Sequence, residues 1–268
     1  MTIDEARRGR YWADVTSPEL AALDAERAVV VLPVSATEQH GPHLPLSTDT
    51  LIVDALMRHA LATHRAGARV YALPTMPIGH SLEHATFAGT LSASAETLLA
   101  LWTDVARGVA RSGARKLVLL NAHGGQRSLV DLAAVRWRAE FGLLVVRANW
   151  FAFGAPPGLF ADDELARGLH GGEVETSLLM HLRPELVRRD QLANFVGRPQ
   201  QHADRAFGPE EAVGYGWLAQ DLHPAGVSGN AAAADAARGA ALFIHLASRL
   251  DALLDDVAAT PLGDLLAP

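Results

Sequence analysis

The sequence predicts an α/β fold in which helices cover both faces of a mainly parallel β-sheet. Short apolar runs alternate along the chain with longer amphipathic stretches, and this alternation of strand and helix is typical of such sheets. Of the 268 residues, 49% are hydrophobic, which is enough for one sizeable core. No internal repeat or linker divides the chain, so we expect one domain over 1–268.

The expected strands are short apolar runs that end at turn residues, and we place them at 28–34, 69–73, 116–120 and 143–146. The expected helices repeat apolar residues at helical spacing, and they cover 50–66, 95–112, 127–141, 174–182 and 231–257. Two segments, 151–170 and 190–230, lack periodicity and are rich in Gly, Pro and Asn. We expect long surface loops there.

The composition excludes several classes of protein. The chain has 23 Lys and Arg against 30 Asp and Glu, a net charge of −7, which argues against a nucleic-acid partner. The absence of cysteine excludes disulfides, thiolate metal sites and a cysteine nucleophile. Any metal must therefore be held by His, Asp and Glu, and 12 histidines are available. The sequence has neither a signal-peptide pattern nor an apolar stretch of membrane-spanning length, so we expect no membrane partner and a cytoplasmic location.

Candidate metal ligands follow the first expected strand directly. Glu38 and His40 are two residues apart, so in extended chain their side chains project to the same side. His43 comes next, and Asp49 lies at the start of the following helix. Taken singly, Asp49 could be a helix cap, Glu38 a solvated loop acid and His43 a surface residue. Together, acids and an imidazole at the carboxyl end of a buried strand indicate a divalent metal site.

The third expected strand ends in a second candidate, His123, which follows Asn121 and precedes two glycines that permit close backbone approach. A packed core histidine is the alternative, but these neighbours favour a site. A further loop that could rim a pocket contains Ser81, Glu83 and His84. The histidines of that loop could equally be surface residues.

The third group of candidates opens a later helix. His170 precedes Glu173 and Glu175, which fall near the first helical turn. The helix dipole favours acids there, so capping could explain one of the glutamates but not both beside a glycine-flanked histidine.

The candidate ligands are Glu38, His40, Asp49, His123 and one of Glu173 or Glu175. Such a set suits two divalent ions bridged by one carboxylate, a site that makes water nucleophilic at neutral pH and polarises a carbonyl. His170 would then carry the proton to a leaving nitrogen. No G-x-S-x-G, G-x-G-x-x-G or P-loop motif occurs, so serine hydrolase, dinucleotide enzyme and nucleotidase functions lack support.

Several ordered segments between about residues 28 and 248 resemble the creatininase family, the creatinine amidohydrolase-like metal hydrolases. They are Glu38–Leu46 with Thr48-Asp49, Ser81–His84 with Phe87 and Gly89–Ser92, Asn121–Gly125, His170–Ser177 and Gly226–Asn230. The resemblance implies a three-layer α/β/α sandwich, assembly as a homo-oligomer, usually a hexamer, and two divalent ions per subunit. Zinc is the expected metal, with manganese or iron as alternatives.

The resemblance also implies roles for individual residues. Glu38 and His123 would bind one ion and His40 the other, Asp49 would bridge them, and His170 would be the acid/base. Members that act on creatinine carry a metal-binding glutamate two residues after the loop histidine, where this chain has Gly125. We therefore expect Glu173 to be the replacement ligand and Glu175 to orient His170.

The expected activity is that of a metal-dependent amidohydrolase that cleaves a linear or cyclic C–N amide, other than an ordinary peptide bond, in a small molecule. Creatinine itself is not expected, because Ala166-Arg167 stand where creatinine-hydrolysing members carry a Trp-Asp pair. The expected pocket residues are His43, Ser81, Glu83, His84, Asn121 and Gly124.

Other functions remain open. One is a metallopeptidase that matures a small modified peptide, with a groove formed by 190–230. Another is a deformylase that cleaves a formamide on a purine-derived intermediate. A non-catalytic metal-binding protein is a third, and the complete set of acids and histidines argues against it.

Overall fold

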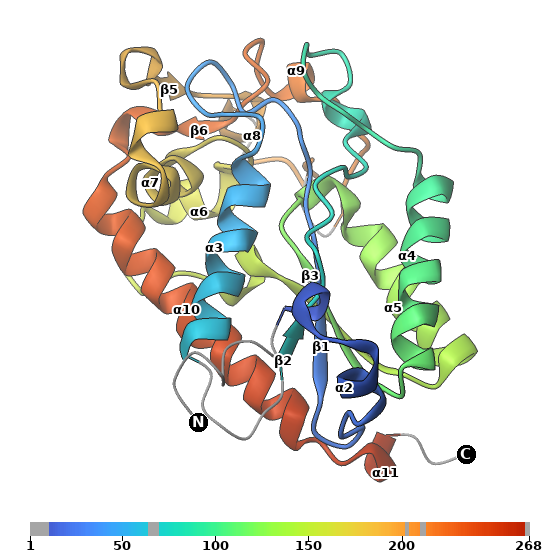
Figure 1. The fold of residues 1–268 in the computed structure, drawn as a ribbon. Helices are drawn as coiled ribbons and strands as arrows, with labels where there is room; N and C mark the ends of the chain where they lie inside the picture. The colour runs from blue at the N-terminus through green and yellow to red at the C-terminus, as the bar shows by residue number, and fades with distance from the viewer. Residues whose placement is uncertain (1–10, 64–69, 202–203, 210–212, 266–268) are drawn as a thin grey trace.

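A four-stranded parallel sheet lies at the centre of the computed structural model, which describes residues 11–63, 70–201, 204–209 and 213–265 (Figure 1). The strands are β1 (Val29–Val34), β2 (Val70–Ala72), β3 (Lys116–Asn121) and β4 (Leu144–Asn149), in the order β2-β1-β3-β4. The predicted α/β fold with a parallel sheet is confirmed. The observed strand ends differ from the expected ones by up to three residues, and Arg69 lies outside the described residues.

Strand β1 shows why the sheet is apolar on both faces. Val29 and Val31 pack into one hydrophobic cluster, whereas Val30, Leu32 and Val34 pack into a second cluster on the opposite face. Successive side chains of a strand point to opposite faces, so a continuous apolar run requires a cover on each side. The sheet therefore lies between two layers of helices.

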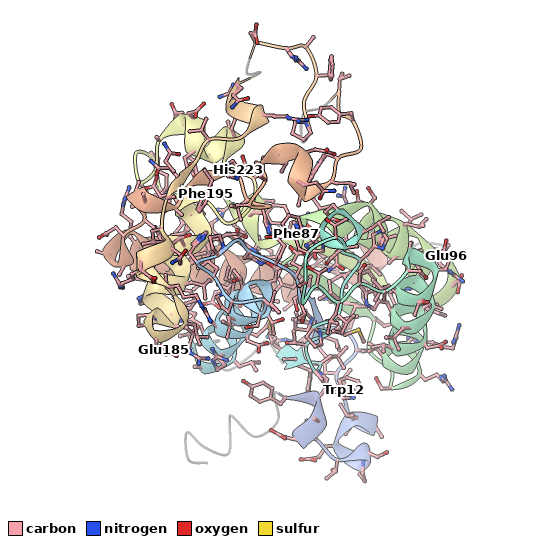
Figure 2. The ribbon with its side chains drawn as sticks, turned by 90° about the horizontal axis from the view of Figure 1, so that it is seen from above. Trp12, Phe87, Glu96, Glu185, Phe195 and His223 are labelled. Carbon is pink, nitrogen blue, oxygen red and sulfur yellow. The ribbon has the colours of Figure 1, made fainter. Side chains whose placement is uncertain are left out.

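Helices α3 (Thr48–Thr63), α7 (Glu173–Leu182) and α10 (Ala236–Ala259) cover one face, and α4 (Ala95–Arg111) and α5 (Arg127–Phe141) cover the other (Figure 1). Seen from above, Glu185 just after α7 and Glu96 in α4 lie at opposite edges of the molecule (Figure 2). The smaller helices are α2 (Ser17–Ala21), α6 (Asp162–Arg167), α8 (Arg198–Gln201), α9 (Ala219–Leu222) and α11 (Leu262–Leu265).

Some expected elements differ from the observed ones. The helix expected over 231–257 begins only at residue 236, because the Asp235 side chain accepts the Arg238 N–H and caps it. The last expected residues of α3, 64–66, lie outside the described residues. The segments expected to be long loops contain α6 and a two-stranded ladder of β5 (Asn194–Phe195) and β6 (Gly229–Asn230), which are too short to show periodicity.

The register of the sheet positions the site. Val34 of β1 pairs with Asn121 of β3, which in turn pairs with Asn149 of β4, so three strands end at the same level. Their carboxyl ends point toward the top of Figure 1, where the loops gather. Among the described residues, none of the helices has the length and hydropathy that crossing a bilayer requires.

Candidate metal centre

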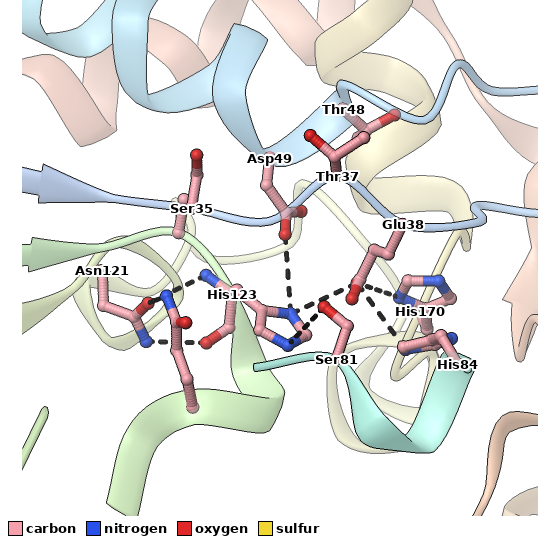
Figure 3. Close-up of polar contacts among 12 residues, drawn as sticks. Ser35, Thr37, Glu38, Thr48, Asp49, Ser81, His84, Asn121, His123 and His170 are labelled. Carbon is pink, nitrogen blue, oxygen red and sulfur yellow. Dashed lines mark hydrogen bonds and ion pairs between the residues drawn. The ribbon is translucent and has the colours of Figure 1, made fainter. Parts of the chain in front are cut away.

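The first two site residues meet because β1 and β3 end side by side. The loop after β1 carries Glu38, and the loop after β3 carries His123. Glu38 Oε1 lies 3.2 Å from His123 Nδ1, and both side chains are buried (Figure 3). The expected clustering of these residues at the carboxyl end of the sheet is thus present in the structure.

Asp49, in the first turn of α3, faces two imidazoles with its two oxygens. Asp49 Oδ1 lies 3.2 Å from His40 Nε2, and Asp49 Oδ2 lies 3.5 Å from His123 Nδ1. This buried carboxylate therefore stands between two histidines that come from different loops. This arrangement suits a carboxylate that bridges two metal ions.

Three histidines are held in defined tautomers by backbone carbonyls. In each ring one nitrogen donates its hydrogen to a carbonyl oxygen, so the other nitrogen is the one directed toward Glu38 or Asp49 and available to a cation. The three distances are 3.1 Å from His40 Nδ1 to Glu38 O, 2.9 Å from His123 Nε2 to His80 O, and 2.6 Å from His170 Nε2 to Gln39 O. These rings are oriented as metal-binding imidazoles are.

A fourth histidine, His84, instead directs a ring N–H toward the carboxylates. The Gln39 amide accepts the Gly41 N–H through Oε1 and donates through Nε2 to the Gly226 carbonyl, so its orientation is fixed. The same Nε2 donates to His84 Nδ1 at 2.7 Å, and the hydrogen of His84 is therefore on Nε2, 3.6 Å from Glu38 Oε1. The rings of His84 and His170 are 4.3 Å apart.

The charges of the buried groups are strongly coupled. Burial alone would raise the pKa of Glu38, but the neighbouring imidazoles, above all His123, lower it well below its usual range. Burial alone would lower the pKa of His40, but Asp49 raises it to about 9. The pKa of His123 is likewise raised well above its usual range, against the effect of burial, mainly by Glu38. Without a metal, the positive charges of protonated His40 and His123 thus offset the negative charges of Asp49 and Glu38.

His170 behaves differently from these two histidines. Burial and the nearby rings of His40 and His84 hold the pKa of His170 well below its usual range. The His170 imidazole is therefore neutral, and its Nδ1 lies 3.8 Å from Glu38 Oε1.

Several buried polar atoms of the site lack a hydrogen-bond partner, among them Glu38 Oε2, Asp49 Oδ2 and His40 Nε2. A buried charged oxygen without a donor is costly, and a cation would remove that cost. Three groups bring ligand atoms within 4.8 Å of one another: Glu38, His40 and His170; Glu38, Glu83 and His123; His40, Asp49 and Glu175. Their oxygen and imidazole donors fit zinc, manganese or iron.

The structure differs from the sequence expectation at Glu173. Its carboxylate forms an ion pair with Arg238 of α10, and it belongs to none of these groups. Glu175 instead belongs to the group with His40 and Asp49, and its Oε2 also accepts the Gly171 N–H at 2.7 Å. Residues two apart on a helix point about 200° away from each other, so only one of the two can face the site. Glu175 thus offers an oxygen within 4.8 Å of ligand atoms of His40 and Asp49. Its expected role in orienting His170 stays a prediction.

The expected pocket residues fall into two sets. Glu83, His84 and Gly124 line a cavity of about 350 Å³ above the site, whereas His43, Ser81 and Asn121 do not. Asn121 braces the β3 loop by donating to the His123 carbonyl at 2.7 Å and accepting the His123 N–H at 3.1 Å. His43 Nε2 donates to the Gly171 carbonyl at 3.0 Å, and Ser81 Oγ lies 3.4 Å from His123 Nε2.

Several cavity residues were not found from the sequence. They include Arg127, Trp150, Phe151, Glu164 and Trp217. Trp150 and Phe151 follow β4 directly, so the end of the fourth strand was an available signal. Trp217 comes from the segment expected to be a surface loop, and its ring lies 6.3 Å from that of His84. The cavity thus has an acidic and imidazole-rich floor and partly aromatic walls.

Comparisons with known proteins agree with this geometry. The family model for creatininase, described as creatinine amidohydrolase, matches residues 13–254. The chain is 38% identical over 170 residues to the mycofactocin precursor peptide peptidase of Mycobacterium ulcerans, which is 61% of this chain and 62% of that protein. It is 32% identical over 190 residues to the creatinine amidohydrolase of Pseudomonas putida, which is 65% of this chain and 72% of that one.

Solved creatininase structures share the fold. A mutant creatininase of Zn-Zn type has a TM-score of 0.72 and 24% identity, over 96% of this chain and 98% of that one. A manganese form of creatininase has the same TM-score and 23% identity, over 96% and 99% of the two chains. The same α/β architecture therefore extends over nearly the whole of both chains.

Proposed function

This chain belongs to the creatininase family, and we propose that it is a metal-dependent hydrolase that cleaves an amide bond of a small modified peptide. The observation that carries this proposal is the cavity: its floor is the carboxylate–histidine cluster, and its walls include Trp150, Phe151 and Trp217. The cluster suits amide hydrolysis, and the walls suit a substrate with bulky side chains.

We propose that two divalent ions bind in the cluster, with zinc as the expected metal and manganese or iron as alternatives. Glu38 and His123 would hold one ion, His40 and Glu175 the other, and Asp49 would lie between them. These assignments follow the buried ligand groups and the two-sided contacts of Asp49. Bound there, the ions would activate water and polarise the carbonyl oxygen of an amide.

We propose that His170 moves the proton during amide cleavage. Its Nε2–H is tied to the Gln39 carbonyl, and its neutral Nδ1 is free to take up a proton beside Glu38. His170 lines the cavity, so the proton can pass on to the leaving nitrogen of a bound substrate. His84, whose Nε2–H faces the same carboxylate, would donate a hydrogen bond there.

Three features favour a peptide over the small amide expected from the sequence. The cavity of about 350 Å³ is in the range that holds drug-sized ligands, about 300–1,000 Å³. Arg127, a cavity residue, supplies a positive charge suited to a peptide carboxylate. The relative from Mycobacterium ulcerans is a precursor peptide peptidase.

Small linear or cyclic amides and formamides are therefore the second candidates. Assembly as a homo-oligomer stays a prediction.

The test is metal analysis followed by a substrate panel. We expect about two divalent ions per chain. We also expect products to be released from short peptides with an aromatic C-terminal residue, and mass spectrometry would detect them. Creatinine and formamidopyrimidines complete the panel, and turnover of these alone would contradict the peptide proposal.

His123→Ala should lose both metal and turnover. His245→Ala is the matched control, because that histidine contacts the Phe153 carbonyl and is outside the ligand groups. Full metal content in His123→Ala would contradict the ligand assignment.

A further inference from the structure

We propose that Glu83 is a direct ligand of the ion held by Glu38 and His123, and that it fills the space which a side chain at position 125 would occupy. The inference rests on the metal centre proposed above. It assigns to Glu83 the role of replacement ligand that the sequence suggested for Glu173.

The contacts of Glu83 place it on the same two imidazoles as Glu38. Glu83 Oε1 lies 3.3 Å from His123 Nε2 and 3.9 Å from His84 Nε2. Glu38 Oε1 lies 3.2 Å from His123 Nδ1 and 3.6 Å from His84 Nε2. Each of Glu38, Glu83 and His123 offers a ligand atom within 4.8 Å of the others. Two acids and one imidazole in this arrangement can surround one cation.

The carboxylate of Glu83 lacks the partner that its burial requires. Its side chain is only 12% exposed, and Oε1 is buried without a hydrogen-bond partner. The nearest nitrogen, His123 Nε2, donates instead to the His80 carbonyl at 2.9 Å. In the metal-free protein the charge of His123, which Glu38 shares, is the nearby positive charge that offsets this oxygen, and Oε1 has no hydrogen bond of its own. A divalent ion between the two carboxylates would supply the missing partner.

The glycine at position 125 accounts for the room that Glu83 occupies. A Cβ at Gly125 would lie 1.6 Å from Glu83 Oε1 and 2.7 Å from His123 Nε2. The φ angle of Gly125 is not in the left-handed region, so the backbone does not demand glycine there. The lack of room for a side chain beside Glu83 is therefore what requires glycine at position 125. Positions 83 and 125 therefore compete for the same volume, and either one could place a carboxylate beside His123.

The first experiment is Glu83→Gln, which keeps the shape and removes the charge. We expect one of the two bound ions to be held at least about tenfold more weakly, measured by metal content per chain at graded chelator concentrations. The metal-free variant should melt at the same temperature as the metal-free parent or higher, because a buried negative charge is gone. Glu173→Gln is the matched control, since that buried glutamate pairs with Arg238 outside the ligand groups, and it should keep both ions.

The second experiment exchanges the two positions. Glu83→Ala should lose affinity for one ion, and adding Gly125→Glu to it should recover at least about tenfold of that loss. Gly125→Glu alone should disturb the site, because two carboxylates would then compete for one place. Unchanged affinity for both ions in Glu83→Gln, or no recovery in the double variant, would overturn the inference while leaving the proposed function intact. A parent protein that binds no divalent ion would overturn both.

Discussion

The substitution Gly239→Ala is expected to destabilise the protein, although the same change normally stabilises a helix. Gly239 lies in α10 where this helix crosses α7, the helix that carries Glu175. A Cβ at position 239 would lie 1.9 Å from the carbonyl oxygen of Ser177 and 2.4 Å from its carbon. Both atoms belong to the α7 backbone, so no side-chain rotation can relieve the overlap and the two helices must move apart.

The expected magnitude follows from two opposing terms. Replacing glycine by alanine inside a helix gains about 1 kcal/mol from backbone propensity. Overpacking of a close contact costs about 1–3 kcal/mol and occasionally more, and an overlap with backbone falls at the upper end. We therefore expect Gly239→Ala to lower the free energy of unfolding by about 1–2 kcal/mol.

Gly108→Ala is the matched control for this prediction. Gly108 lies inside α4, is exposed, and has nothing within 4 Å of its would-be Cβ, so only the propensity gain remains. Urea unfolding of the metal-free proteins should shift the two midpoints in opposite directions at unchanged slope. A Gly239→Ala protein as stable as the parent would refute the reasoning. In that case the contact between α7 and α10 would not be as close as the structure has it.

Three further predictions concern the site. His43 is buried, and burial lowers its pKa to about 4. Between pH 6.5 and pH 4 the unfolded chain binds a proton at this imidazole and the folded protein does not. The free energy of unfolding should therefore fall by up to about 3 kcal/mol as the pH is lowered through this range. His43→Gln should lose less stability over that range in urea titrations, and an identical pH dependence would contradict this. Chelator treatment should lower the melting temperature, and zinc or manganese at about 100 times the dissociation constant should restore about 2.7 kcal/mol; the absence of any shift would count against a metal centre. Trp217→Ala should raise KM for a peptide about tenfold or more with little change in kcat, and a loss confined to kcat would contradict a binding role.

The sequence predicted the sheet and the large helices because hydrophobic periodicity determines them. The run from Val29 to Val34 is apolar at every side-chain position on both faces, and a strand covered on both faces requires such a run. The short helix α6 and the ladder of β5 with β6 could not be predicted in this way. They are too short for a repeated hydrophobic pattern to be recognised, and tertiary contacts, such as the Asn230 N–H bonded to Glu164, hold them in place.

The candidate site was predictable where a strand end positions the residue and unpredictable where packing decides. Glu38 and His123 follow paired strands, so their meeting follows from topology. The choice between Glu173 and Glu175 depended on which face of α7 turns inward, and Arg238 from the distant α10 occupies the other face. The role of Glu83 depended on the missing side chain of Gly125, a relation between two loops that no local pattern encodes.

The loops that carry the ligands also hold one another in place. The Gln39 carbonyl, between Glu38 and His40, accepts the hydrogen of His170 from a different loop. The His80 carbonyl, three residues before Glu83, accepts the hydrogen of His123 in the same way. Each backbone segment thus fixes the imidazole of another segment, and these bonds use the ring nitrogens that are not next to Glu38. The imidazoles are therefore oriented by the protein itself, before any cation binds, and the energy of metal binding is not spent on ordering them.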